Sequence, residues 1–493
     1  MFPSYSTTAS TGRRIASAVA SVDGSSAMSV QATSTVHVSV SALVRDIFRY
    51  ARIIRLIIVS SVITSPFWLG ALFFTSPHNY SFASSLVCVP LLAIIGTVAV
   101  AHVAQRDAYL RRLLFAGLAA HMAASSMFIW IGFHIYGGTV DAFHYWTVGL
   151  QLSKEFQIIG WAAFRPPYWS TNLIDNVCGI AALLIGDALP TLFILFALVS
   201  LAGGYIFYRA FVVAFPNGDR WLFGMLVVLL PSLLFWSSFV GKDAPIQYFI
   251  ALTCYGFAKL TQRPGPRGVL LCAVGLTGAL LIRAHVAAML AIAMTFPFAV
   301  GRQRSGGAGI AARILLIPAL IAGSYFLISQ AQSFLYANLN NDNTISLFQE
   351  ADTITRTSQI GGSAFNEGTS LPVRIAESPF LLFRPFPWEM RSAIALAPAL
   401  ESVGLMILCW LRRREIWSTL RHWRDPFVGF LLMYSVVFLI TFGGAISNFG
   451  ILLRQRIMVI PIAFMLLCAT SKPTSQTSAP AEDDWLRMQA GRV

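Results

Sequence analysis

The sequence predicts an all-α protein, a polytopic bundle of transmembrane helices, and two observations lead to this fold class. Of the 493 residues, 56% are apolar and only 11% are charged, whereas soluble domains carry about a quarter charged residues. Long apolar stretches follow one another along most of the chain, and basic residues fall between them in every second loop. A conventional soluble enzyme is therefore excluded.

The apolar stretches are each near the length that a helix needs to cross a bilayer. They lie at approximately 54–75, 82–104, 113–136, 188–212, 221–240, 245–260, 268–283, 286–301, 314–331, 393–411, 427–445 and 457–470. Several are short for a span, so we expect about twelve spans, give or take two. Tryptophan and tyrosine concentrate near the ends of these stretches, as expected for residues that anchor helices at a membrane interface.

The basic residues predict the orientation of the bundle. Lys and Arg number 35 against 21 Asp and Glu, a net charge of +14. Cytoplasmic loops are enriched in Lys and Arg, so the loops that hold the clusters, and both termini, should face the cytoplasm. The clusters are Arg45/Arg49/Arg52/Arg55, Arg106/Arg111/Arg112, Lys259/Arg263/Arg267, Arg302/Arg304/Arg313 and Arg412/Arg413/Arg414/Arg421/Arg424. The excess charge indicates contacts with anionic membrane lipid, and nucleic acid is not an expected partner.

The two ends of the chain differ from the rest. Residues 1–42 are rich in Ser, Thr, Ala and Val without an apolar signal-peptide core, and residues 471–493 hold Ser, Thr, Pro and an acidic run. Both should be disordered cytoplasmic tails. The transmembrane domain then covers residues 43–470, with two large outer loops at 137–187 and 332–392.

The cysteines give no indication of a disulfide framework or a metal centre. All six are scattered, mostly within apolar stretches, and they form no CxxC pair, so buried inert thiols are expected. We expect no cofactor, and a divalent metal remains open without a motif to support it.

The first outer loop predicts helices that lie flat on the membrane surface. In residues 137–187, apolar side chains recur at helical spacing between polar ones, and Pro166-Pro167 should divide this layer into two pieces. The second loop, 332–392, is polar and ends in the aromatic-proline run FLLFRPFPWEMR. Long loops inside a compact protein are usually functional or disordered, and this run favours a functional loop that returns to the membrane surface.

Basic residues recur at the outer ends of several spans, where a charge is costly and indicates function. These residues are Lys242, Arg283, Arg384, Arg454 and Arg456. Together they would bind a lipid phosphate or pyrophosphate, because arginine donates paired hydrogen bonds to phosphate oxygens and lysine adds a point charge. Each alone has a plainer explanation: a terminal Arg or Lys can extend to head groups, and Lys242 with Asp243 can form an ion pair that caps a helix.

A carboxylate near these cations would complete a site for group transfer, and Asp141 is the first candidate. It follows the third span, and His144 and Tyr145 come three and four residues later, on the same face of a helix. Such a carboxylate can take a proton from an acceptor hydroxyl while cations stabilise a departing phosphate. Asp141 as an ordinary helix N-cap is an equal alternative. The weaker candidates are Asp175, Asp187, Glu155 and Glu389.

Four segments resemble known families. The segment GGTVDAFHYWTVG resembles the first outer loop of GT-C-fold glycosyltransferases, which implies a catalytic Asp141 and a polyprenyl-phosphate sugar donor. The segments PSLLFWSSFVGKDAP, LLIRAH and NFGILLRQR resemble bacterial polysaccharide-biosynthesis membrane proteins, including Wzy-type polymerases of exopolysaccharide or O-antigen synthesis. By that resemblance, undecaprenyl pyrophosphate would be held by Arg283, Arg384, Arg454 and Arg456.

We therefore expect an inverting glycosyltransferase or polysaccharide polymerase of the bacterial inner membrane, with residues 43–470 as its catalytic domain. It would transfer a sugar or glycan from a polyprenyl-(pyro)phosphate donor to a hydroxyl acceptor on the periplasmic side. Asp141 would act as the base, and His285 would bridge acceptor and phosphate. The expected substrate contacts are His144, Tyr145, Trp146, Asp243, Trp388 and Glu389, with Tyr145, Trp146 and Trp388 stacking on sugar rings.

A transporter or flippase of lipid-linked glycans is the main alternative. It would also need outer cations, but it should carry polar residues deep inside its spans, where charges are nearly absent here. The histidines within spans, His102, His121 and His134, should instead be packing residues satisfied by their neighbours. A non-catalytic scaffold that assembles with other polysaccharide export proteins is a third alternative.

Overall fold

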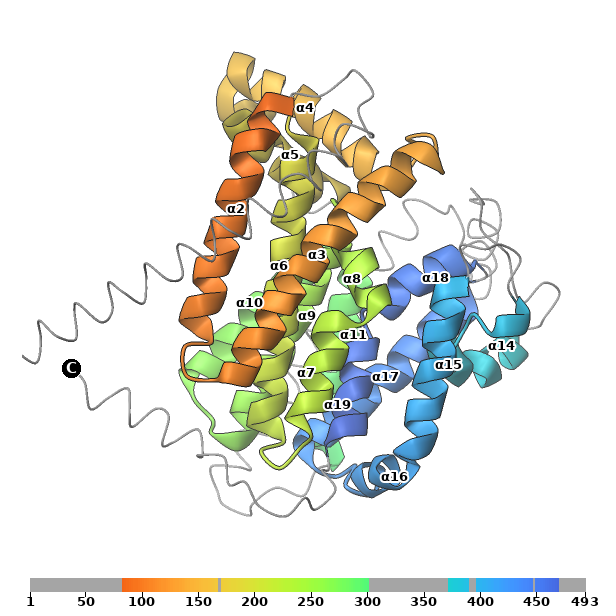
Figure 1. Cartoon of the computed structure of the whole chain (residues 1–493). Helices are drawn as coiled ribbons and strands as arrows, with labels where there is room; N and C mark the ends of the chain where they lie inside the picture. Colours follow the sequence, from red (N-terminus) through yellow and green to blue (C-terminus); the bar gives the residue numbers. More distant parts are fainter. Residues whose placement is uncertain (1–81, 167–169, 301–370, 390–395, 447, 470–493) are drawn as a thin grey trace, which may run out of the picture. The chain divides into compact units, whose positions relative to one another are not determined.

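A computed structural model describes residues 82–166, 170–300, 371–389, 396–446 and 448–469 (Figure 1). The chain divides into a unit at 1–69 and a unit at 70–493, and every described residue belongs to the second. All regular elements in these ranges are helices, which confirms the all-helical prediction there. The predicted tails at 1–42 and 471–493, the stretches at 54–75 and 314–331, and most of the loop 332–392 lie outside the described residues.

The described helices follow the predicted apolar stretches closely. The α-helices are α2 (Phe82–Val103), α3 (Ala108–His134), α4 (Asp141–Ile159), α5 (Ser170–Ile185), α6 (Leu189–Ala214), α7 (Arg220–Leu229), α8 (Pro231–Ser237), α9 (Asp243–Gln262), α10 (Pro266–Ile282), α11 (Ala284–Val300), α14 (Leu371–Glu377), α15 (Leu396–Leu411), α16 (Arg413–Arg421), α17 (Pro426–Ala445), α18 (Phe449–Arg456) and α19 (Ile460–Cys468). Three short 3-10 helices are η1 (Gly160–Ala163), η2 (Ser378–Leu382) and η3 (Pro387–Glu389).

Four of these helices are long and apolar enough to cross a membrane. They contain the segments Ser84–Val103, Ala108–His134, Leu189–Ala214 and Pro426–Gly443. Two more spans result if the bent pairs α7–α8 and α18–α19 each count as one. The bend of 42° between α7 and α8 falls at Pro231, because proline has no N–H to continue the helix and its ring clashes with the preceding turn. Several predicted stretches form shorter apolar helices, so the number twelve remains a prediction.

Acidic and amide side chains set the start of several helices. Asp107 accepts hydrogen bonds from the backbone N–H groups of Tyr109 and Leu110 and so caps α3. Asp219 caps α7, Asp425 caps α17 and Asn448 caps α18. The N–H groups in the first turn of a helix have no partner within the helix, and such caps satisfy some of them.

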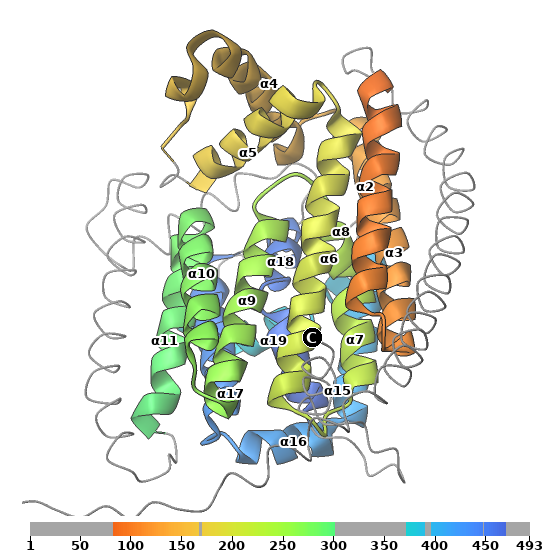
Figure 2. The same ribbon diagram turned by 90° about the vertical axis from the view of Figure 1, so that its left-hand side faces the viewer.

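The loop predicted at 137–187 forms α4 and α5, which pack against each other. Figures 1 and 2 show this pair at one end of α6. The close approach depends on small residues: a side chain at Gly149 would meet Cys178 at 2.6 Å. The helix α4 ends at Ile159 because Gly160 turns the chain with a φ of 60°, a conformation that favours glycine. The first break in this layer therefore comes before Pro166.

The basic turns lie at the opposite end of the helices from α4 and α5. The turns α2–α3 and α9–α10 and the helix α16 occupy this end (Figures 1 and 2). Arg412, at the start of α16, forms an ion pair with Asp219 in the turn between α6 and α7. The backbone N–H of Asp219 in turn donates to the carbonyl of Cys468 at the end of α19. Basic residues from several predicted cytoplasmic loops therefore lie at one end.

A glycine in α10 tests the close packing of this helix on α9, and a glycine in α15 serves as the control. In α10, a side chain at Gly275 would meet the backbone of Thr253 and Phe249 at 2.7 and 2.9 Å, whereas Gly404 in α15 has open space around it. We expect Gly275→Ala to destabilise the protein by about 1–3 kcal/mol because the two backbones must separate. Gly404→Ala should stabilise it slightly, since alanine favours a helix by up to about 1 kcal/mol. Thermal unfolding in detergent measures both changes. A lower melting temperature for Gly404→Ala than for the wild-type protein would contradict the open space around Gly404.

Candidate functional site

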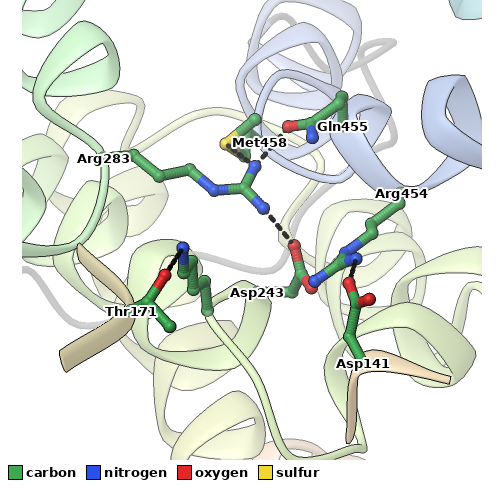
Figure 3. A network of polar contacts seen from close by, with 8 residues as sticks. Asp141, Thr171, Asp243, Arg283, Arg454, Gln455 and Met458 are labelled. Atoms are coloured by element: carbon green, nitrogen blue, oxygen red, sulfur yellow. Dashed lines mark hydrogen bonds and ion pairs between the residues drawn. The ribbon is translucent and has the colours of Figure 1, made fainter. Parts of the chain in front are cut away.

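The centre of the candidate site is Asp243, the first residue of α9. Its side chain is 1% exposed, and two guanidinium groups bind it. Arg283 Nη2 lies 2.9 Å from Asp243 Oδ1, and Arg454 Nε lies 2.6 Å from Asp243 Oδ2. Figure 3 shows the two arginines approaching this carboxylate from different sides. The position at a helix N-terminus also favours a negative charge, so Asp243 is held as a buried ionic centre.

Arg454 continues the network to the predicted base. Its Nη1 lies 2.6 Å from Asp141 Oδ2, at the start of α4. Asp141 is 63% exposed at its side chain, whereas Arg454 is 19% exposed, with its guanidinium 5.6 Å from the ring centre of Phe239. The network therefore runs from a buried carboxylate, through an arginine, to a carboxylate that solvent reaches (Figure 3).

Local structure on separate helices positions these groups. Arg283 is the C-cap of α10, where the backbone leaves the helix in an extended conformation. Arg454 lies in the second turn of α18, a helix whose start is fixed by the Asn448 cap. Asp243 and Asp141 begin α9 and α4. Four helices thus converge here, and their ends lie far apart in the sequence.

Two further partners of Arg283 come from the segment that holds Arg454. The Nη1 atom of Arg283 donates a hydrogen bond to Gln455 Oε1 and lies 3.5 Å from Met458 Sδ. Sequence reasoning missed both residues. Gln455 stands between the two arginines of LLRQR, which could have identified it as a polar neighbour. Met458 gives no comparable signal in the sequence.

Lys242 precedes Asp243 and reaches toward α5. Its Nζ donates a hydrogen bond to Thr171 Oγ1 at 2.9 Å, a contact that the sequence did not predict. Burial and the nearby charges of Arg283 and Arg454 lower the pKa of Lys242 to about 8, against the opposing effects of Asp243 and Asp141. The pKa still places most of the Lys242 population in the charged form at pH 7.

The charges of these five residues do not cancel. Arg283, Arg454 and Lys242 contribute three positive charges, and Asp141 and Asp243 contribute two negative ones. The charges of the three cations would stabilise an anionic ligand beside them. Arginine and lysine side chains are the usual partners of phosphate oxygens. The arrangement is therefore suited to binding a phosphate-containing ligand.

The residues that follow Asp141 in α4 face different ways. His144 is exposed, whereas Tyr145 and Trp146 are buried. Burial raises the pKa of Tyr145 to about 12, which keeps its phenol protonated. The indole N–H of Trp146 donates to Asp187 Oδ1 at 3.2 Å. The rings of Tyr145 and Trp146 are packed inside the protein, so their expected stacking on sugar rings has no support in this arrangement.

His285 lies near the network without joining it by a hydrogen bond to any described residue. It lies in the first turn of α11, two residues after Arg283, and is half-buried. Its ring packs edge-on against Phe442, with ring centres 5.8 Å apart. The predicted role of His285 in bridging acceptor and phosphate remains a prediction.

Arg456 is not part of this network, although it is only two residues from Arg454. Two residues along a helix correspond to a rotation of about 200°, so the two side chains leave α18 on opposite sides. Arg456 is 1% exposed and pairs with Glu401 of α15 at 2.8 Å. It also donates to the carbonyl oxygens of Leu382 and Arg384 at 3.1 and 3.0 Å. These contacts indicate a structural role, in place of the phosphate-binding role expected from the sequence.

The residues predicted in the aromatic-proline run contact one another. Arg384 Nε lies 3.1 Å from Glu389 Oε1, and Glu389 Oε2 accepts a hydrogen bond from the backbone N–H of Phe386. Trp388 stacks on Phe386 with ring centres 4.9 Å apart and is 78% exposed. The side chains of Arg384 and Glu389 therefore pair with each other, and the carbonyl oxygen of Arg384 accepts the hydrogen bond from Arg456. Trp388 presents an open aromatic ring, as stacking on a sugar would require.

Comparisons with known proteins identify no relative of this chain. No protein-family model, curated protein or solved structure matches it. Within the ranges that the structure describes, no group of three or more His, Cys, Asp or Glu side chains could hold a metal ion.

The buried Asp243 and the exposed Asp141 should differ in their effect on stability. Asp243→Asn removes the charge that two guanidinium groups share in a buried place, so we expect a loss of about 3 kcal/mol or more. Asp141→Asn removes one exposed partner of Arg454 and should cost less than about 1 kcal/mol. Thermal unfolding of both variants in the same detergent measures the difference. Equal melting temperatures would show that Asp243 is not the ionic centre of the site.

Proposed function

We propose that this protein is a membrane-embedded glycosyltransferase or polysaccharide polymerase. It transfers a sugar or glycan from a polyprenyl-(pyro)phosphate donor to a hydroxyl acceptor, and so builds a cell-surface polysaccharide on the periplasmic side of a bacterial inner membrane. The observation that carries the proposal is the contact of the exposed Asp141 with Arg454, which connects a carboxylate that substrate can reach to a group of cations.

The proposed reaction is a single displacement. Asp141 accepts the proton of the acceptor hydroxyl, and the hydroxyl oxygen forms a bond to the anomeric carbon of the donor. The bond from that carbon to the donor phosphate breaks, and its electron pair leaves with the phosphate or pyrophosphate. Arg454, Arg283 and Lys242 stabilise the negative charge that develops on the leaving group. The displacement inverts the anomeric carbon.

The contact between Arg454 and Asp141 fits this role. The ion pair holds the Asp141 carboxylate beside the cations. The guanidinium has five N–H donors, so Arg454 can bind a phosphate while it keeps its bond to Asp243. Because Asp243 anchors Arg454 from the buried side, a phosphate donor competes only for the exposed bond to Asp141.

Transport of lipid-linked glycans would require polar groups within the helices that can contact the cargo. A group of buried polar side chains at mid-helix instead binds within the protein. His121 contacts the carbonyl of Gly117 at 2.8 Å and Ser200 Oγ at 3.1 Å, and Ser200 Oγ lies 2.5 Å from Ser237 Oγ. This network joins α3, α6 and α8, and its hydrogen bonds support packing. It therefore favours the enzyme over the transporter.

Asp141→Asn should abolish polymer formation while the protein remains folded and abundant. The amide cannot accept the acceptor's proton, so we expect a loss of at least about a hundredfold in rate, within the contribution of general bases. The measurement is the amount of surface polysaccharide together with the lipid-linked oligosaccharide that accumulates in cells. Full-length repeats on the lipid would identify a polymerase, and a truncated repeat would identify a transferase that adds one residue.

Glu155→Gln provides the matched control. Glu155 lies on the same helix, about 21 Å further along its axis at 1.5 Å per residue, and accepts a hydrogen bond from Gln151. This variant should retain wild-type polymer. Normal polymer from Asp141→Asn would exclude Asp141 as the base, and accumulation of the lipid-linked glycan on the cytoplasmic leaflet would favour the transporter.

Lys242 should give the reaction a pH dependence. Its pKa of about 8 in the free protein means that its positive charge is present below pH 8 and is lost as the pH rises. Binding of an anionic donor should therefore weaken above pH 8, and kcat/KM, which reports on the free enzyme, should fall with it by about tenfold. Lys242→Arg keeps its charge and should show a flat profile there. The same decline in Lys242→Arg would show that Lys242 is not the group responsible for the pH dependence. Lys154→Gln, which changes an exposed residue on α4, is the control.

A further inference from the structure

A second charged surface lies at the end of the helices away from Asp141. The helix α16 connects α15 to α17 and runs across the ends of the long helices (Figures 1 and 2). The ion pair of Arg412 with Asp219 fixes its start. On its inner face Thr419 is buried and Ile416 packs against the main apolar core. The helix is therefore held firmly on one side.

The outer face of α16 and its flanking residues is strongly basic. The exposed cations are Arg413, Arg414, Arg421 and Arg424. The acidic residues among 410–425 are Glu415 and Asp425, and Asp425 caps α17 through the N–H groups of Phe427 and Val428. The surface therefore has a net positive charge and is suited to an anionic partner.

Three tryptophans accompany these arginines and are exposed. Trp410, Trp417 and Trp423 are 68%, 60% and 38% exposed. A guanidinium lies over each ring, at 4.5 Å for Arg413 on Trp410, 5.8 Å for Arg421 on Trp417 and 5.0 Å for Arg424 on Trp423. Each tryptophan is thus paired with an arginine. We call these six residues the Trp–Arg surface.

The helix α15 indicates what covers the Trp–Arg surface. Large apolar side chains are exposed along it, including Leu400 at 61% and Ile407 at 55%, and they lead to Trp410 and Leu411 at its end. An exposed apolar helix is compatible with lipid tails, and tryptophan is enriched where tails meet head groups. The arginines beyond that boundary are then at the level of the lipid phosphates.

We propose that the Trp–Arg surface binds the head groups of anionic phospholipids, with phosphatidylglycerol as the representative. The guanidinium groups donate hydrogen bonds to the lipid phosphate, and the indole rings insert at the boundary between head groups and acyl chains. An amphipathic helix with basic and tryptophan residues binds membranes in this way. This binding site is separate from the network of Asp141 and Asp243 and does not depend on the proposed function.

The test compares two variants of the full-length protein that lose the same charge at the same end. The first is Arg413→Gln/Arg421→Gln/Arg424→Gln. The control is Arg106→Gln/Arg111→Gln/Arg112→Gln, which removes three exposed arginines at the α2–α3 turn. Native mass spectrometry in neutral detergent measures the binding of added phosphatidylglycerol and phosphatidylcholine. Melting temperatures without added lipid confirm that both variants are folded.

The wild-type protein and the control variant should bind phosphatidylglycerol in preference to phosphatidylcholine. Each basic residue near an anionic surface contributes about 1 kcal/mol, or roughly fivefold, so the first variant should lose affinity by at least about tenfold. Equal losses in both variants would show a diffuse charge effect and overturn the proposal, as would unchanged binding in the first variant. Competition by inorganic phosphate as strong as that by the lipid would show a site for soluble anions and overturn it too.

Discussion

The shared carboxylate of Asp243 is the constraint on which the candidate site depends. One buried anion holds two guanidinium groups from different helices, so the ends of α9, α10 and α18 are brought together by charge as well as by packing. A buried ion is favourable only when its partners are in place. Because buried Asp243 must keep its guanidinium partners, the direction of Arg454 is fixed. Arg454 in turn fixes the position of the exposed Asp141, which it contacts.

The helix α18 divides its two arginines between two tasks. Arg454 faces the exposed carboxylate of Asp141, and Arg456 faces Glu401 and the backbone of the aromatic-proline run. The short helix α18 therefore contacts both the candidate site and the segment that carries Trp388. Charged residues are few in this chain, and the ion pairs of Asp243 and Arg456 lie in buried places, where ionic contacts are stronger than in water.

The sequence predicted the helices better than the contacts among their side chains. Apolar length placed most of the described helices within a few residues, because burial of apolar surface follows composition directly. It also indicated Asp141, Lys242, Arg283 and Arg454, which the structure places together with Asp243. It failed for Arg456, since helix rotation decides which way a side chain faces, and for Thr171, since its contact depends on how α5 packs. Neither the direction of a side chain on its helix nor the packing of α5 follows from charge and sequence position alone.

The break between α7 and α8 makes residues near Pro231 depend on a contact with the C-terminal part of the described region. The N–H of Ser232, just after Pro231, donates to Glu401 Oε2 at 2.7 Å, while the other oxygen of Glu401 binds Arg456. The broken helix leaves backbone donors that the lipid interior would not hydrate, and a side chain 169 positions away satisfies one of them. The N–H of Ser232 can therefore reach this acceptor only after residue 401 has been synthesised, so this hydrogen bond at the kink is a late event in biogenesis.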